Sequence, residues 1–158
     1  MRWIWIDRFE EFVPLKRAKA VKNVSLAEEH LHDHWPDYPI MPASLMIEGM
    51  AQTAGILVGQ ARNFKEKVIL AKIAKAEFTD IVTPGDQITY EAEIESLAPE
   101  AAATVGKVYK NGRLIGQVDL MFSHIDQNLG GVKFPKENFV FTGQFERLIA
   151  PFLETGDG

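Results

Sequence analysis

The sequence predicts an α+β fold in which one long central helix is wrapped by a curved antiparallel β-sheet. Two features lead to this prediction: a long apolar segment typical of a helix begins at residue 43, and strand-like segments separated by strong turn signals follow it. A helix packed on a sheet is one of the few layered arrangements that bury the apolar faces of both. The chain has 158 residues, the size of one domain, so we expect residues 1–158 to form a single domain.

The helix is predicted over residues 43–62, which is about 30 Å at 1.5 Å per residue. Pro42 suits its entrance, Ser44 can cap it, and no proline follows for many residues. Its apolar residues surround it instead of forming one stripe, which indicates that other structure encloses it. Residues 33–43 are predicted to form a stiff, extended loop, because a helix or central strand would not tolerate the three prolines of this segment: Pro36, Pro39 and Pro42.

Strands are predicted on both sides of the helix. Residues 13–24 alternate imperfectly between apolar and polar side chains, which indicates a strand before the loop. The strands predicted after the helix are residues 68–79, 87–97, 101–110 and 113–123. The first two flank the turn signal Thr83-Pro84-Gly85-Asp86, and the last two flank Asn111-Gly112, so we expect an antiparallel meander.

Composition and charge argue against several classes of protein. The net charge is −5, whereas a nucleic-acid-binding protein usually presents a basic face to phosphates. The chain has no cysteine, which excludes disulfides, a thiolate nucleophile and a cysteine-ligated metal, and fits a reducing compartment. The N-terminus lacks the features of a signal peptide, and the most apolar stretch, residues 45–58, is shorter than a membrane span. We therefore expect a soluble, cytoplasmic protein with no nucleic-acid or membrane partner.

Glu48 is the most informative residue of the predicted helix. It is the only residue between Asp37 and Arg62 that can carry a charge near neutral pH, and the helix around it is predicted to be buried. A buried carboxylate needs hydrogen bonds or holds a proton at neutral pH, and a protonated carboxyl group is what a general acid requires. The alternative is a Glu48 that faces solvent or a structural partner. Gln52 lies one turn further on the same face, where it could orient Glu48, touch a ligand or lie at the surface.

Histidines gather at the start of the proline-rich loop. His34 lies on this loop, and histidine is the side chain best suited to act as a base near neutral pH. The prolines would give it the fixed geometry that a catalytic base needs; the alternative is a bystander. His30, His32 and His34 alternate and, with Asp33, could form a metal site on the face of a strand, but no further ligand cluster supports them, so we expect no metal. His124 is expected to be structural.

The backbone amides of Ala43 and Ser44, the first of the helix, are candidates for substrate binding. The first N–H groups of a helix lack intrahelical acceptors and lie at the positive end of the helix dipole, so they can stabilise negative charge on a carbonyl oxygen. The alternative is that they bind water or the Ser44 hydroxyl.

The segment HWPDYPIMPASLMIEGMAQ, residues 34–52, strongly resembles the signature of the 3-hydroxyacyl-[acyl-carrier-protein] dehydratases of bacterial fatty-acid synthesis. The segments KRAKAVKNVSLAEEH upstream and AEFTDIVTPGDQITYEAEI downstream are similar to the family's flanking segments, so the resemblance covers about residues 7–123. The signature positions in register are His34, Pro36, Pro39, Pro42, Leu45, Glu48, Met50, Ala51 and Gln52. Three residues stand where the family has glycine, which bears on substrate choice: Asp33, Asp37 and Ala43.

The resemblance implies a hotdog fold, a dehydratase activity, and a homodimer whose active sites lie at the subunit interface, with His34 from one subunit and Glu48 from the other. In the implied mechanism, His34 removes a proton from C2 of the acyl chain. The Ala43 amide stabilises the charge on the thioester oxygen, and Glu48 protonates the leaving 3-hydroxyl group. Ser44 lies beside that amide, and Gln52 matches the family's glutamine behind the acid. Glutamate as the acid implies dehydration without double-bond isomerisation, and the chemistry needs no metal or redox cofactor.

The sequence leaves the substrate carrier, the assembly and two rival functions open. The two alternatives for the carrier of the thioester are an acyl carrier protein and coenzyme A. The two alternatives for the assembly are a separate dimer and a trimer of dimers. The rival functions are a hotdog thioesterase, whose carboxylate would activate water or attack the thioester, and a non-catalytic acyl-binding protein. Residues 126–158 lie beyond the resemblance as a C-terminal extension. Within it, residues 145–153 predict a short docking helix broken at Pro151, and residues 154–158 are expected to fray.

Docking of an acyl carrier protein, which is acidic, would require a local basic patch on a chain of net charge −5. One candidate cluster precedes the active-site loop: Lys16, Arg17, Lys19 and Lys22. A second follows the helix: Arg62, Lys65 and Lys67. The alternative is that both are ordinary solvated charges.

Overall fold

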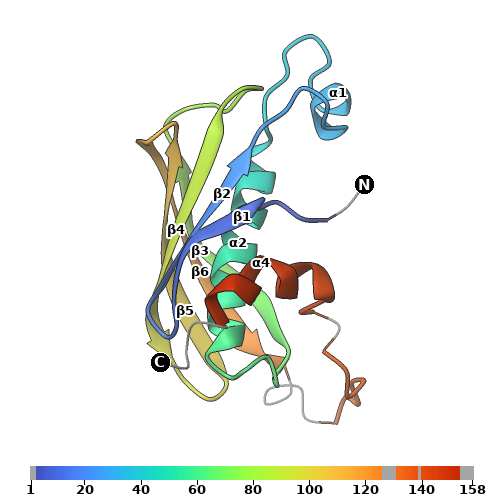
Figure 1. Ribbon diagram of the computed structural model, residues 1–158, viewed down its shortest axis with the longest axis vertical. Coiled ribbons are helices and arrows are strands. Elements are labelled where there is room, and N and C mark those ends of the chain that lie inside the picture. Colours follow the sequence, from blue (N-terminus) through green and yellow to red (C-terminus); the bar gives the residue numbers. More distant parts are fainter. Residues whose placement is uncertain (1–2, 126–130, 139, 154–158) are drawn as a thin grey trace.

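A computed structural model describes residues 3–125, 131–138 and 140–153 of the chain (Figure 1). Its strands are β1 (Arg8–Val13), β2 (Arg17–Asn23), β3 (Val68–Phe78), β4 (Gln87–Leu97), β5 (Ala101–Lys110) and β6 (Arg113–His124). Its helices are α1 (His30–Asp33), α2 (Ala43–Gln60) and α4 (Gly143–Leu153). Figure 1 shows α2 running along one face of the sheet, where it contacts strands β2 to β6. The predicted α+β class, with a central helix against a curved antiparallel sheet, is therefore confirmed.

The sheet has the strand order β1-β2-β4-β5-β6-β3, and every pairing is antiparallel. Strands β4, β5 and β6 form the predicted meander, and Asn111 and Gly112 make its tight turn with φ of 49° and 83°. The prediction was wrong for β3, which pairs with β6 at the far edge and not with β4. The connection after β3 does not fold back as a hairpin. Instead it passes the start of α2, where the amide of Met41 donates to the carbonyl of Val82 at 2.8 Å.

The chain before α2 also differs from the prediction. Residues 13–24 are not one strand, because the chain turns after Val13: Leu15 has a φ of 65°, and the amide of Lys16 donates to the carbonyl of Val13 at 3.0 Å. Strand β1 on the other side of this turn was not predicted, and neither was the single helical turn α1. The predicted loop is present from His34 to Pro42, but it is not extended throughout, because the amide of Tyr38 donates to the carbonyl of Trp35 at 3.0 Å.

Helix α2 begins where the sequence places it and ends two residues earlier than predicted. It ends at Gln60 because Asn63 and Phe64 adopt left-handed conformations, and the amide of Phe64 bonds back to the carbonyl of Gly59 at 2.9 Å. Pro42 is its N-cap residue and no side chain caps it, so the expected cap by Ser44 was wrong. The prediction of an enclosed helix is confirmed by the residues buried on several sides: Met46, Gly49, Met50, Gln52, Thr53, Ala54, Ile56, Leu57, Val58 and Gly59.

The C-terminal helix α4 continues through Pro151 to Leu153, so the predicted break at this proline was wrong. Only two helical residues follow Pro151, which limits how much of the helix the proline can disturb. The helix packs on β1: Ile149 is fully buried, and the rings of Phe152 and Phe12 lie 6.4 Å apart. Residues 154–158, which were expected to fray, lie outside the described residues. No helix in the described ranges is long and apolar enough to span a membrane.

Two glycines of α2 offer a matched test of how closely the helix approaches the sheet. A Cβ atom at Gly49 would lie 2.4 Å from the ring and hydroxyl of Tyr90, whereas one at Gly55 would lie 3.4 Å from Phe122, an ordinary contact. We expect Gly49→Ala to lower the free energy of unfolding by about 1–3 kcal/mol, and Gly55→Ala to raise it by about 0.5–1 kcal/mol. Urea denaturation measures both. Equal stabilisation by the two substitutions would contradict the close contact with Tyr90.

Candidate active site

Glu48 lies half-buried on α2, and two N–H groups hold one of its carboxylate oxygens. The indole Nε1 of Trp3 donates to Oε1 of Glu48 at 3.0 Å, and Nε2 of Gln52 donates to the same oxygen at 3.0 Å. Among the described residues, no donor is paired with Oε2. The carboxyl group therefore has one oxygen fixed by the protein and one available to another molecule.

Gln52 links the acid to the N-terminal segment. Its Oε1 accepts from the backbone amide of Trp5 at 2.7 Å, and its Nε2 also donates to the carbonyl of Trp3 at 3.3 Å. The side chain is buried, and its amide is engaged on both sides. These contacts favour the orienting role for Gln52 over direct contact with a ligand.

Trp3 is the site residue that sequence reasoning missed. It is 45 residues from Glu48 in the chain, and its ring lies across that of Trp5, with centroids 5.7 Å apart. The available signal was the pair of tryptophans at alternate positions before the first strand. Side chains two residues apart in an extended segment lie on the same side, which would bring both indoles onto the helix.

An apolar cavity of about 300 Å³ begins at Glu48 and follows α2. Its lining on the helix is Glu48, Ala51, Gln52, Gly55, Ile56 and Gly59. These residues recur every three or four positions and so form one face of the helix. The other walls come from Trp3, from the start of β3 and from residues of the C-terminal extension. The acid therefore lies at the edge of a space that suits an apolar chain.

His34 lines a different cavity, of about 500 Å³, at the start of α2. The side chain is exposed, and its backbone amide donates to the carbonyl of His30 at 3.2 Å. Ala43 lines the same cavity together with Phe78 and Thr79 from the end of β3. Ala43 is not among the described residues with positive φ, so its β-carbon does not stop it from offering its amide at the start of the helix. Ser44, the next residue, is also exposed.

One chain does not bring His34 and Glu48 together. The two cavities have no lining residue in common: one holds Glu48 and the start of β3, and the other holds His34, Ala43 and the end of β3. Each chain therefore contains two partial sites, one with a carboxyl group and an apolar cavity, the other with an imidazole and the amides of a helix start.

The histidines before the loop do not form a metal-binding face. His30 and His32 lie on the helical turn α1 and His34 is its C-cap residue, so the strand on which the three would share a face is absent. A ring nitrogen of His32 lies 2.7 Å from the carbonyl of Leu26, and burial lowers the pKa of His30, opposed in part by the charge of Glu28. Across residues 3–125, 131–138 and 140–153, no group of three or more His, Cys, Asp or Glu side chains could hold a metal ion.

His124 is fully buried at the end of β6, which supports the expected structural role. Its Nδ1 lies 2.9 Å from the carbonyl oxygen of Pro99 and 2.8 Å from Oε2 of Glu66. These contacts tie β6 to the segments before β3 and β5.

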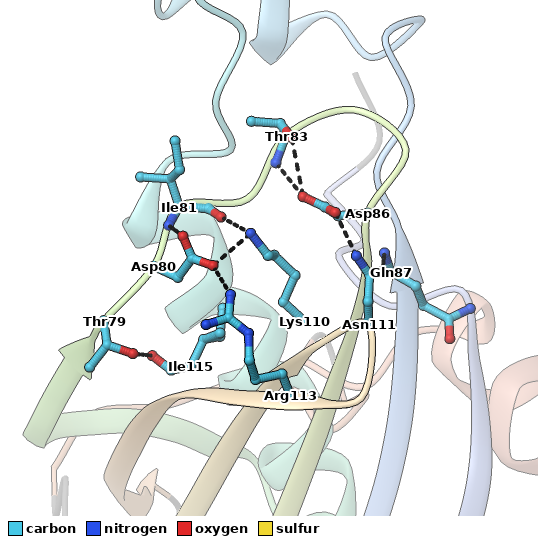
Figure 2. A network of polar contacts seen from close by, with 10 residues as sticks. All are labelled: Thr79, Asp80, Ile81, Thr83, Asp86, Gln87, Lys110, Asn111, Arg113 and Ile115. Atoms are coloured by element: carbon cyan, nitrogen blue, oxygen red, sulfur yellow. Dashed lines mark hydrogen bonds and ion pairs between the residues drawn. The ribbon is translucent and has the colours of Figure 1, made fainter.

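A polar network braces the segment between β3 and β4, which forms one wall of the His34 cavity (Figure 2). Asp80 accepts from Lys110 at 2.7 Å, from the Ile81 amide at 2.8 Å, and from Arg113. The hydrogen bond from Lys110 is the largest effect that lowers the pKa of Asp80.

Asp86 closes the turn that ends this segment. Burial alone would raise the pKa of Asp86, but hydrogen bonds from Thr83 and Asn111 outweigh burial and hold it below its usual value. The distances are 2.9 Å from the Thr83 amide and 2.7 Å from Nδ2 of Asn111 (Figure 2).

The FabA-like domain model matches residues 4–119. The chain belongs to this family. It is 35% identical over 122 residues to the 3-hydroxyacyl-[acyl-carrier-protein] dehydratase FabZ of Halalkalibacterium halodurans, an alignment that covers 77% of this chain and 87% of that protein. It is 37% identical over 125 residues to the enzyme of the same name from Natranaerobius thermophilus, covering 78% of this chain and 88% of that protein.

Solved structures share the fold at low sequence identity. The dehydratase heterocomplex ApeI:P from Xenorhabdus doucetiae has a TM-score of 0.64 at 12% identity, over 81% of this chain and 90% of that one. A hypothetical thioesterase protein with coenzyme A from Streptococcus pneumoniae TIGR4 has a TM-score of 0.60 at 9% identity, over 73% and 83%. The hotdog fold implied by the sequence resemblance is confirmed.

The hydrogen bonds to Asp86 predict that part of the stability of the folded protein depends on pH. A carboxyl group whose pKa is lowered by folding stabilises the protein above its ordinary value of 3.8, and this stabilisation disappears as the pH falls through the folded-state pKa. We expect the melting temperature of the wild type to exceed that of Asp86→Asn by a constant amount above about pH 5, and the difference to shrink below about pH 4. Thermal melts across this range measure it. A difference that is the same at every pH would show that the charge of Asp86 plays no part.

Proposed function

We propose that this chain is a dehydratase that converts a 3-hydroxyacyl thioester, carried by an acyl carrier protein, to a trans-2-enoyl thioester in fatty-acid biosynthesis. The observation that carries the proposal is the identity of 35–37% to curated dehydratases over more than three quarters of the chain. His34 and Glu48 stand at the positions of the base and the acid in that family's signature.

The proposed step breaks the C2–H and C3–O bonds and forms the C2–C3 double bond. His34 takes the proton from C2, and the Ala43 amide at the start of α2 stabilises negative charge on the thioester oxygen. Glu48 gives a proton to the 3-hydroxyl group, which leaves as water. The protonated imidazole and the carboxylate then exchange protons with solvent, so no oxidant or reductant is consumed.

The hydrogen bonds of Glu48 indicate which oxygen carries the proton. Oε1 accepts N–H donors from Trp3 and Gln52, and a hydroxyl oxygen in that position would be a poorer acceptor for both. The acidic proton therefore belongs on Oε2. In this proposal, Trp3 and Gln52 are positioning residues that aim the second oxygen at the substrate.

A homodimer is proposed because β3 is a long edge strand with apolar side chains exposed. It has β6 on one side and no strand on the other among the described residues. Ile69, Leu70 and Ile73 are exposed along it, an arrangement that favours pairing with another strand. We propose that this edge of β3 pairs antiparallel with β3 of a second copy of the chain, about a two-fold axis.

Antiparallel pairing of β3 with itself supports a shared active site. The Glu48 cavity is lined by the start of the strand, Val68, Ile69 and Leu70, and the His34 cavity by its end, at Phe78. In an antiparallel pair the start of one strand lies beside the end of the other. Each Glu48 cavity would then adjoin the partner's cavity with its base and helix amides, which completes both sites at once.

The partner and the location are proposed from the relatives and from the composition. The relatives named above act on carrier-protein thioesters, and we propose the same carrier here, with a cytoplasmic location that fits a chain without cysteine. In the first basic cluster, three of the four residues form ion pairs: Arg17 with Glu11, Lys19 with Glu91, and Lys22 with Glu28. In the second, Lys67 is buried and Lys65 is exposed. A trimer of dimers stays a prediction.

A product assay separates the proposed function from its rivals. Incubation with a 3-hydroxyacyl thioester should yield enoyl thioester with no free thiol. Release of free thiol would identify a thioesterase, and neither product would identify an acyl-binding protein.

The catalytic pair is tested by His34→Ala and Glu48→Gln. Each should lower kcat by at least ~100-fold, the usual scale for loss of a general base or acid. Glu48→Gln is nearly isosteric, so its melting temperature should stay close to that of the wild type. Near-normal turnover by Glu48→Gln would exclude the mechanism proposed here.

Two tryptophan variants serve as matched controls for the role of the acid. Trp3→Phe removes one donor to Glu48 and should lower kcat about threefold to tenfold with little change in KM. The indole nitrogen of Trp5 has no hydrogen-bond partner among the described residues, so Trp5→Phe should leave kcat nearly unchanged.

The shared site is tested by mixing the two inactive proteins. After subunit exchange at equal ratio, half of the dimers are mixed, and each has one site with both groups and one with neither. Activity should therefore recover to about a quarter of the wild-type value if exchange is random and the sites are independent. No recovery despite proven exchange would place His34 and Glu48 of one site in the same subunit.

A further inference from the structure

The Glu48 cavity is a groove made by small side chains on α2. Ala51, Gly55 and Gly59 recur at four-residue intervals on the face that lines it. From Glu48 to Gly59 the helix rises about 16 Å at 1.5 Å per residue. The cavity therefore extends along three turns of helix away from Glu48.

Part of the cavity wall comes from residues that the family model does not match. The model ends at residue 119, whereas Asn138, Val140, Phe141 and Phe145 line the cavity. They face Phe64, which follows the end of α2. Figure 1 shows α4, which begins next to these residues, on the same side of the sheet as α2. We call Phe64, Phe141 and Phe145 the aromatic wall.

Specific contacts hold the aromatic wall in place. The rings of Phe141 and Phe64 are stacked, with centroids 3.7 Å apart and planes 10° from parallel. Asn138 donates to the carbonyls of Phe64 and Glu66 at 3.0 and 3.4 Å, and its Oδ1 accepts from the amides of Val140 and Phe141 at 3.1 and 3.0 Å. The buried Ile149 of α4 anchors the segment on its other side.

We infer that the aromatic wall is the closed end of the acyl site and sets the longest chain that the enzyme accepts. The inference rests on the proposed function, because it takes Glu48 as the group at the reacting end. A cavity of about 300 Å³ is at the small end of the range for ligand pockets, so a short or medium acyl chain fills it. Longer chains would have to displace stacked rings, whereas shorter chains leave apolar surface uncovered.

The test measures kcat/KM for a homologous series of 3-hydroxyacyl thioesters from short to long chains. Phe141→Ala and Phe145→Ala should each shift the preferred length upward, with the long-to-short ratio rising roughly fourfold for each further methylene that is buried. Phe141→Leu should give a smaller shift in the same direction and keeps an apolar side chain if alanine destabilises the fold. Phe152→Ala is the matched control: it also removes an aromatic ring of the extension, but one that contacts Phe12 and does not line the cavity.

A substitution inside the groove should act in the opposite direction. A Cβ atom at Gly55 has room, and leucine is a better helix former than glycine, so Gly55→Leu should fold and fill the middle of the cavity. It should abolish activity on long chains and keep activity on the shortest.

The outcomes separate this inference from the proposed function. An unchanged length profile in the Phe141 and Phe145 variants, with shortening by Gly55→Leu, would overturn the aromatic wall as the end of the site while leaving dehydration in place. A shift of equal size in Phe152→Ala would also overturn it, because the effect would then come from the extension as a whole. Absence of dehydration by the wild type on every chain length would instead remove the proposed function.

Discussion

The close approach of α2 to the sheet is the constraint on which the rest of the structure depends. At Gly49 the helix leaves no room for a side chain against Tyr90, and at Gly106 the sheet leaves none against Met50. Burial raises the pKa of Tyr90 far above its usual value, so its hydroxyl stays neutral at this contact. Two missing β-carbons thus let the helix lie within van der Waals distance of the strands. Because Glu48 is adjacent to Gly49, this packing also fixes the position and direction of the acid.

The same packing explains why one chain carries two partial sites. Different parts of α2 border the two ends of β3. The start of the helix, with its first amides near Ala43, borders the cavity at the end of β3, and the face with Glu48 borders the cavity at the start of β3. These cavities lie at opposite ends of β3, one of the two edge strands of the sheet, which has no strand on its outer side among the described residues. Antiparallel pairing of two β3 strands across that edge would place the Glu48 cavity of one chain beside the His34 cavity of the other. Parallel pairing would instead place each cavity beside its own copy.

Structure that depends on neighbouring residues was predicted correctly, whereas the wrong predictions concern strand pairing and turns that depend on more than the local sequence. The bounds of β4 and β5 match the prediction. Strand β5 ends and β6 begins at the predicted residues because the chain reverses at Asn111-Gly112, with the positive φ values that this pair favours. The position of β3 at the far edge depends on pairing with β6, which the turn signal at residues 83–86 does not encode. The turn at Leu15 lacks glycine, so one strand was predicted where the structure has a hairpin.

The residues of the candidate site also fall into two groups, those that the local sequence pattern indicates and those that depend on contacts between distant parts of the chain. The pattern of residues 34–52 locates His34, Ala43, Glu48 and Gln52, since their spacing lies within one loop and three turns of helix. The donor from Trp3 arises from a contact across 45 residues of chain, and the alternation of Trp3 and Trp5 does not specify Glu48 as its acceptor. The aromatic wall arises in the same way, because Phe64, which precedes β3, meets Phe141 and Phe145, which follow the last strand.

The residues that orient Glu48 and the residues of the extension that line the cavity lie in different parts of the molecule. The donors to Glu48 come from the N-terminal segment and from Gln52, and the extension lines the cavity farther along α2, which rises about 16 Å from Glu48 to Gly59. Effects of substitutions at sites farther apart than about 10 Å, with no shared partner, usually add. The groups that perform the chemistry and the groups that limit the chain length are therefore separable, because α2 connects them as a rigid element. Variation in the extension can change the size of the substrate without disturbing the hydrogen bonds that orient Glu48.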